Sequence, residues 1–75
     1  MHTITVPNIT EEISTFKVIN LLVAEQSHVV AEQAICELET DKIVLEIPAP
    51  ATGQIHWLVQ LQDEVNVGDA LCTIQ

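Results

Sequence analysis

The sequence predicts an all-β domain, a sandwich or small barrel built from two related halves. Short runs of alternating, largely β-branched residues, separated by turn residues, recur along the chain. The second half also repeats the first at a spacing of 36 positions. The identical pairs are Leu22/Leu58, Val23/Val59, Gln26/Gln62, Val29/Val65, Ala34/Ala70 and Cys36/Cys72. We therefore expect two copies of one β unit, related by a pseudo-twofold axis, that bury each other's apolar faces.

Eight segments have the length and composition of short strands, and none is convincingly helical. The first alternates and stops at a proline, the second alternates less cleanly, and the third is very short. The fourth and fifth flank a polar pair, the sixth follows Gly53, the seventh is short, and the eighth closes the chain. The predicted strands are Thr3–Pro7, Lys17–Val23, Val29–Val30, Ile35–Thr40, Lys42–Pro48, Gln54–Gln60, Val65–Val67 and Ala70–Gln75.

Length and composition indicate one domain, residues 1–75, with an aliphatic core. Hydrophobic residues make up 48% of the 75 positions, but aromatic residues only 3%, so Ile, Val, Leu and Ala must fill the interior. The longest uncharged apolar stretch, Val18–Ala24, is too short to span a membrane, and no basic region precedes it as in a secretory signal. Trp57 shares one strand face with Ile55 and Val59, which indicates a core position.

The charge balance is strongly acidic, with eleven Asp and Glu residues against two lysines and a net charge of −9. Nucleic acid is therefore excluded as an expected partner, whereas basic protein surfaces would be attracted. Cys36 and Cys72 are mates in the repeat and are predicted to be small core residues, with their thiols reduced. The three histidines show no metal-ligand spacing with these cysteines, so no metal site is expected.

Lys42 is the residue that points to a function. It lies with Asp41 between the fourth and fifth predicted strands, which places it at the tip of a hairpin. A lysine on an exposed turn, surrounded by acids, suits covalent modification, although an ordinary solvated turn lysine is the alternative. No Ser/His/Asp or Cys/His nucleophilic set is visible, so no catalytic residue is predicted.

These features together resemble the lipoyl domain of 2-oxo acid dehydrogenase complexes. The resemblance rests on Glu39-Thr40-Asp41-Lys42, the Ile-Val-Leu-Glu-Ile-Pro-Ala-Pro that follows, Gly53, and Val67-Gly68-Asp69-Ala70-Leu71. It implies a flattened barrel-sandwich of two four-stranded antiparallel sheets with pseudo-twofold symmetry. It also implies that Lys42 carries lipoate in amide linkage, and that Glu39, Asp41 and Gly53 serve recognition by the modifying enzyme.

The resemblance further implies a set of partners. They are a lipoate ligase or lipoyltransferase, a thiamine-dependent 2-oxo acid decarboxylase, an acyltransferase core and the flavoprotein dihydrolipoyl dehydrogenase. The extra residues after Pro7 match a loop near the lysine, so Glu11 and Glu12 are candidates for contact with the decarboxylase. The domain is expected to be monomeric and cytoplasmic, or in the mitochondrial matrix if eukaryotic. It is either an excised domain or a freestanding carrier.

Several alternatives stay open at this point. The sequence looks most like the succinyltransferase of the 2-oxoglutarate complex, with the acetyltransferase of the pyruvate complex close behind. A biotinyl carrier is less favoured, because Asp41 and Ile43 flank the lysine where that class has methionines. An unmodified structural or docking module is the other option. Gln26 and Gln62 stand where the family usually has glycine, and a turn that needs positive φ is costlier there.

Overall fold

The computed structural model describes all 75 residues, and they form eight strands and no helix. The all-β prediction is confirmed, and each predicted strand has an observed counterpart. The strands are β1 (His2–Thr5), β2 (Thr15–Leu21), β3 (His28–Val29), β4 (Ala34–Glu39), β5 (Val44–Pro48), β6 (Gly53–Trp57), β7 (Glu64–Asn66) and β8 (Ala70–Ile74). No helix long and apolar enough to cross a membrane is present.

The strands form two four-stranded antiparallel sheets, as the resemblance implied. One sheet has the order β1-β8-β6-β3 and the other has the order β5-β4-β2-β7. The repeat relates β1 to β5, β2 to β6, β3 to β7 and β4 to β8. Replacing each strand by its counterpart converts one sheet order into the other. The pseudo-twofold relation expected from the sequence is therefore present in the strand order itself.

Every predicted strand differs from the observed one by one to three residues at one or both ends, and two of these differences have a clear structural cause. β5 begins at Val44 and not at Lys42, because residues 40–43 form the connecting turn. β6 ends at Trp57, where its last partner in β8 is Cys72, and the chain then turns back at residues 60–63. Local alternation continues through both regions, but the strand ends where its neighbour ends.

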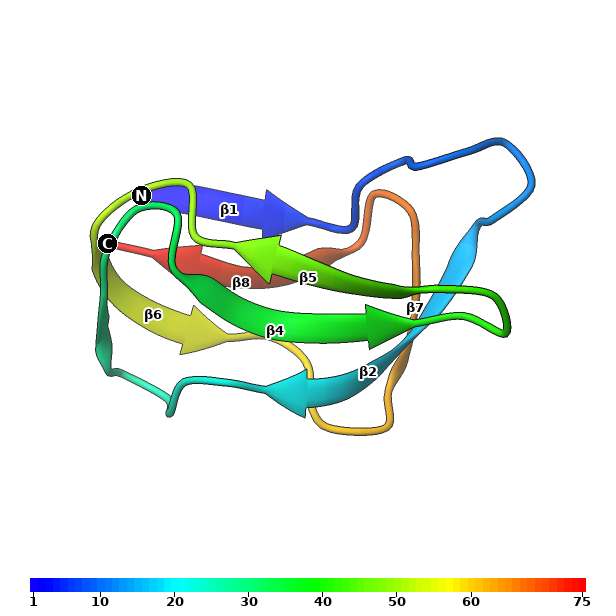
Figure 1. Cartoon of the computed structure of the whole chain (residues 1–75). Helices are drawn as coiled ribbons and strands as arrows, with labels where there is room; N and C mark the ends of the chain where they lie inside the picture. Colours follow the sequence, from blue (N-terminus) through cyan, green and yellow to red (C-terminus); the bar gives the residue numbers. More distant parts are fainter.

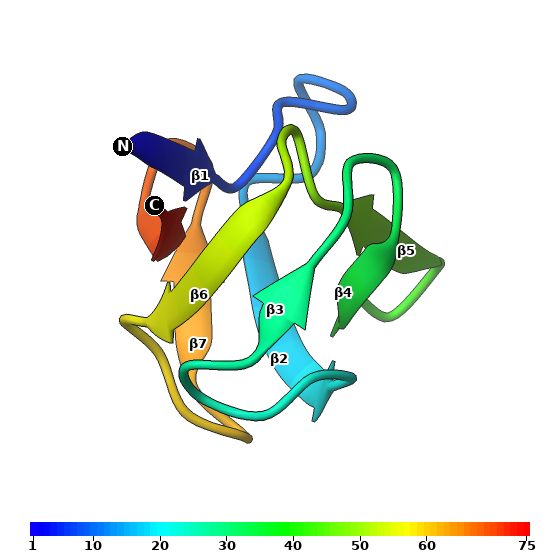
Figure 2. The same cartoon turned by 90° about the vertical axis from the view of Figure 1, so that its left-hand side faces the viewer.

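The interior is aliphatic, as composition predicts. Fifteen buried residues form one cluster, and no polar or charged residue is buried among them. Phe16 is the only aromatic residue in this cluster, and Trp57 is partly buried against its edge. The two chain ends lie together at one end of the molecule, and the β4–β5 connection lies at the other (Figures 1 and 2).

Candidate functional site

The β4–β5 hairpin holds Lys42 at its tip. Leu38 pairs with Leu45 across the hairpin, and the last register pair is Glu39 with Val44. Leu38 is fully buried and Leu45 packs against the core, so the hairpin is anchored to the barrel three to four residues from the lysine. The tip itself projects away from the sheets (Figure 1).

Thr40 fixes the backbone of the tip. Its N–H donates to the carbonyl of Ile43 at 2.9 Å. Its hydroxyl oxygen accepts from the N–H groups of Lys42 and Ile43, both at 3.1 Å. Neither Asp41 nor Lys42 has positive φ, so the turn is not of the I′ or II′ kind common in two-residue hairpins. The Thr40 hydroxyl accepts the hydrogen bonds that a backbone carbonyl would otherwise accept in a turn. Threonine often has this role in turns, but the sequence analysis did not identify it here.

The side chain of Lys42 is free. The residue is exposed, and its side chain takes part in no hydrogen bond or ion pair. The single ion pair in the molecule joins Glu25 and His56, away from the hairpin. An amine that is neither buried nor paired is available to an incoming enzyme, which is the condition that covalent modification needs.

Two acids near Lys42 are predicted to serve recognition by the modifying enzyme. Both are exposed, and neither forms a hydrogen bond or ion pair with the Lys42 side chain. Asp41 is the neighbouring tip residue, and Glu39 lies at the end of β4. In the sheet register Lys17 lies opposite Glu39 on one side and Glu64 on the other. Glu39 therefore presents its carboxylate at the outer surface of the sheet, directly below the tip.

Gly53 has a packing role at the opposite end of the molecule. It is the first residue of β6, beside the chain ends, and pairs with Val29 of β3. A Cβ atom at this position would collide with the carbonyl oxygen of Gln75 and lie 2.8 Å from the Ile74 side chain. The close approach of the last strand explains why this position is a glycine. Gly53 therefore lies far from Lys42, outside any surface around the hairpin tip.

The loop that carries Glu11 and Glu12 projects from the same end as the lysine hairpin (Figure 1). Thr10 and Ile13 close it, with the Ile13 N–H donating to the Thr10 carbonyl at 3.2 Å. Both glutamates are exposed at its turn. No hydrogen bond or ion pair joins this loop to the hairpin, so it stands as a separate feature of the lysine end.

The cysteines are buried free thiols. Desolvation raises the pKa of Cys36 to about 12 and that of Cys72 to about 11. Thiols held protonated in this way are poor nucleophiles, which agrees with the core role predicted for them. No group of three His, Cys, Asp or Glu side chains gathers in a geometry suited to a metal ion.

Two four-stranded sheets with an exposed, unpaired lysine at a hairpin tip have the architecture of a domain that can carry a covalently attached group. The family model described as biotin-requiring enzyme, the biotin/lipoyl family, matches residues 2–74. The chain belongs to this family, and the resemblance found in the sequence is confirmed.

Curated relatives are acyltransferase chains. The acetyltransferase component of the pyruvate dehydrogenase complex of Azotobacter vinelandii is 43% identical over 60 residues, which is 79% of this chain and 9% of that protein. The succinyltransferase component of the 2-oxoglutarate dehydrogenase complex of Cupriavidus necator is 30% identical over 66 residues, 88% of this chain and 16% of that protein. The chain thus spans a small part of the length of these relatives.

A solved structure shows the same fold over the whole length. It is the lipoyl domain of the 2-oxoglutarate dehydrogenase complex from Azotobacter vinelandii, with a TM-score of 0.82 and 28% identity. The match covers 100% of this chain and 96% of that one. The chain therefore has the fold of a lipoyl domain over its whole length.

Proposed function

We propose that this chain is a lipoyl carrier domain of a 2-oxo acid dehydrogenase complex and that Lys42 is the residue that receives lipoate. One observation carries the proposal: Lys42 is an exposed, unpaired lysine on a fixed turn at the end of a lipoyl-type barrel. The other lysine, Lys17, lies within β2 with an acid opposite it on either side, and has no such presentation.

The residues at the tip fit a lipoyl group. Lipoate attached through an amide to Nζ of Lys42 would supply a dithiolane that accepts and releases acyl groups. The chain's own part is to position the attachment point. Leu38 and Leu45 anchor the hairpin, Thr40 holds its tip, and the lysine side chain has open solvent around it. A rigid hairpin with a mobile lipoyl-lysine side chain would let one carrier domain reach several active sites.

Recognition by the modifying enzyme is assigned to the surface next to Lys42. Glu39 and Asp41 are exposed there, and a strongly negative tip would attract a basic active-site entrance. Gly53 serves this recognition only by allowing the barrel to close. Glu11 and Glu12, on the second loop of the lysine end, are the candidates for contact with the decarboxylase.

The complex served is either that of pyruvate or that of 2-oxoglutarate. Sequence reasoning placed the 2-oxoglutarate complex first, and the neighbouring solved structure comes from such a complex. The acetyltransferase relatives, at 43% and 36% identity, exceed the succinyltransferase relative at 30% and favour pyruvate. The rate of reductive acylation of the lipoylated chain, measured with each purified decarboxylase, distinguishes the two complexes. We expect the higher rate with the decarboxylase that acts on pyruvate.

The proposal extends to the form and partners of the chain. All 75 residues would act as one domain, monomeric because a net charge of −9 opposes self-association. Its partners would be a lipoate ligase or lipoyltransferase, the decarboxylase, the acyltransferase core and dihydrolipoyl dehydrogenase. We propose the cytoplasm as its location, or the mitochondrial matrix if the source is a eukaryote.

Mass spectrometry of the chain expressed with a lipoate ligase and lipoate tests the attachment. We expect the mass to rise by one lipoyl group on Lys42. The Lys42→Arg variant should lose the increment completely, and Lys17→Arg, the matched control, should keep it.

The other outcomes select the alternatives. A biotin-sized increment in cells that contain both ligases would identify a biotinyl carrier, a possibility that family membership alone leaves open. A folded chain without any increment would instead indicate a docking module and would refute the carrier proposal.

A further inference from the structure

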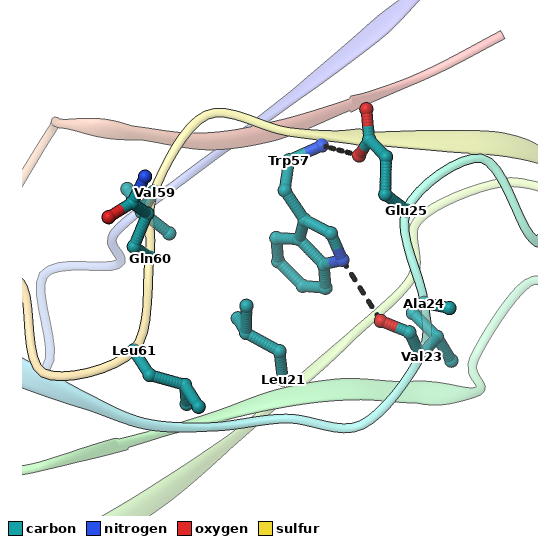
Figure 3. A pocket seen from close by; sticks show the side chains of 8 residues that line it. All are labelled: Leu21, Val23, Ala24, Glu25, Trp57, Val59, Gln60 and Leu61. Carbon is teal, nitrogen blue, oxygen red and sulfur yellow. Dashed lines mark hydrogen bonds between the residues drawn. The ribbon is translucent and has the colours of Figure 1, made fainter.

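An apolar groove lies between the ends of β2 and β6, outside the lysine site. Its volume is about 680 Å³. Figure 3 shows the Trp57 indole facing Leu21, with Leu61 beside it. The lining residues form four pairs at the repeat spacing of 36: Leu21 with Trp57, Val23 with Val59, Ala24 with Gln60, and Glu25 with Leu61. The groove therefore lies on the pseudo-twofold axis, where neither half covers the other.

Apolar side chains form most of this groove, since six of its eight lining residues are hydrophobic. Leu61 is 52% exposed, and Leu21, Val23, Trp57 and Val59 are partly buried against the core. The lining is therefore an apolar surface that is open to solvent. Its burial by a partner would remove apolar area from water and favour binding.

The polar groups of Trp57 and Glu25 in the groove are already hydrogen-bonded within the protein. The Trp57 indole N–H donates to the carbonyl of Val23 at 3.0 Å. The Trp57 backbone N–H donates to one Glu25 oxygen at 2.6 Å, and the other Glu25 oxygen pairs with His56 at 2.6 Å. These groups are therefore not free to bind a ligand, and a lining with six hydrophobic residues out of eight favours aliphatic side chains.

The backbone around the groove offers no strand edge, because the lining residues that follow Leu21 and Trp57 lie outside any strand. The N–H groups of Leu22, Leu58 and Gln60 donate to the Ile35 carbonyl, the Leu71 carbonyl and the Asp63 carboxylate, each at 2.9 Å. An extended peptide would therefore find no regular ladder of main-chain partners here. A helix satisfies its own backbone and needs only an apolar face, which is the mode of recognition that such a groove permits.

Charge defines the rest of the occupant. Asp63 closes the turn that carries Leu61, Glu64 follows it, and the whole chain has a net charge of −9. A second copy of this chain would be repelled, whereas lysine or arginine residues flanking the apolar face of a helix would be attracted. We propose that this groove binds a basic amphipathic helix of another protein.

The single tryptophan of the chain makes the proposal testable by fluorescence, because Trp57 lines the groove. The probe is a synthetic helical peptide with leucines at spacings of three and four, lysines elsewhere and no aromatic residue. We expect a saturable blue shift of Trp57 emission. A peptide with glutamate in place of lysine, and one with glutamine in place of leucine, should produce no shift.

Two matched variants locate the binding. Leu61→Gln should raise the dissociation constant about tenfold, because a half-exposed leucine that a partner would bury is removed. Val30→Gln, which is 51% exposed but outside the groove, should leave it unchanged, and both should keep the thermal midpoint of the parent. Lys42→Arg should also bind normally, so failure here is separable from failure of the carrier proposal.

Three results would overturn the proposal. One is unchanged Trp57 emission with the leucine–lysine peptide. Another is equal weakening by Leu61→Gln and Val30→Gln, which would indicate attraction by charge alone. The third is an emission shift that follows protein concentration without any peptide, together with a dimer in sedimentation, since the occupant would then be a second copy.

Discussion

At the scale of single residues, positive φ angles identify positions under local strain. Gln26 has a φ of 69° and Gln62 a φ of 74°, so these turns do require the conformation for which glycine is best suited. The cost expected from the sequence is therefore confirmed in geometry. A third such residue, Glu32 at 74°, is the repeat mate of Gly68 at 93° and escaped sequence analysis, since nothing in its local sequence signals a turn of this kind.

Replacing Gln62 by glycine should stabilise the domain. A residue with a Cβ atom in the left-handed region costs about 1–2 kcal/mol, and glycine returns about 0.5–1 kcal/mol of this through its larger unfolded-state entropy. We expect a gain of about 0.5–1 kcal/mol in the free energy of unfolding, measured by urea titration. Gln62→Ala keeps the Cβ atom and should give no gain. A loss of stability on Gln62→Gly would show that the side chain itself is important.

Glu25 makes a pH-dependent contribution to stability. The Trp57 N–H and then His56 lower the pKa of Glu25 below its ordinary value of 4.5. An acid whose pKa is lowered by folding stabilises the folded state. This contribution is fully present at pH values above the pKa in the unfolded chain, and it is lost as the pH falls through the pKa in the folded protein. Glu25→Gln should therefore lower the thermal midpoint at pH 7, and the difference from the parent should shrink as the pH falls below 4.5.

Glu46→Gln is the matched control, since it removes the same charge. Glu46 faces Glu37 across the β4–β5 pair, and like charges in directly opposed positions are destabilising. This control should be neutral or stabilising at pH 7. A fall in midpoint equal to that of Glu25→Gln would indicate that net charge, and not the Glu25 contacts, determines the effect.

At the scale of elements, the lysine hairpin depends on Thr40. Loss of its hydroxyl leaves two N–H groups at the tip without an acceptor in the protein, although water can reach them. Thr40→Val should lower the free energy of unfolding by about 1 kcal/mol and slow lipoylation, because the lysine is presented less uniformly. Thr40→Ser retains the hydroxyl and should behave like the parent. Unchanged lipoylation of a folded Thr40→Val chain would contradict this positioning role.

At the scale of the whole molecule, charge repulsion opposes folding. Eleven acids and two lysines are carried on 75 residues, and neither lysine forms an ion pair. Salt screens such repulsion, with a Debye length of about 10 Å at 0.1 M. Raising sodium chloride from 10 mM to 500 mM should raise the thermal midpoint by several degrees, corresponding to about 1 kcal/mol. At pH 4.3, the pI of the sequence, the effect should vanish.

The sequence by itself determined the eight strands, the two related halves, the aliphatic core and the lysine at a hairpin tip. Each of these follows from local alternation, from turn residues or from the repeat, all of which are properties of neighbouring positions. Gly53 and Trp57 show where that reasoning stopped: one is required by the last strand passing close to it, and the other lines a groove between the halves.

Only the tertiary structure decided which strands pair, that Thr40 closes the tip, that Glu25 joins the loop after β2 to β6, and that the Lys42 amine is free of any acid. Apart from the Thr40 turn, which joins residues two and three positions apart, these features depend on residues distant in sequence: the Glu25 contacts span more than thirty positions, to His56 and Trp57. A hydrophobic pattern specifies which faces must be buried, but packing of the two halves against each other determines what is left exposed.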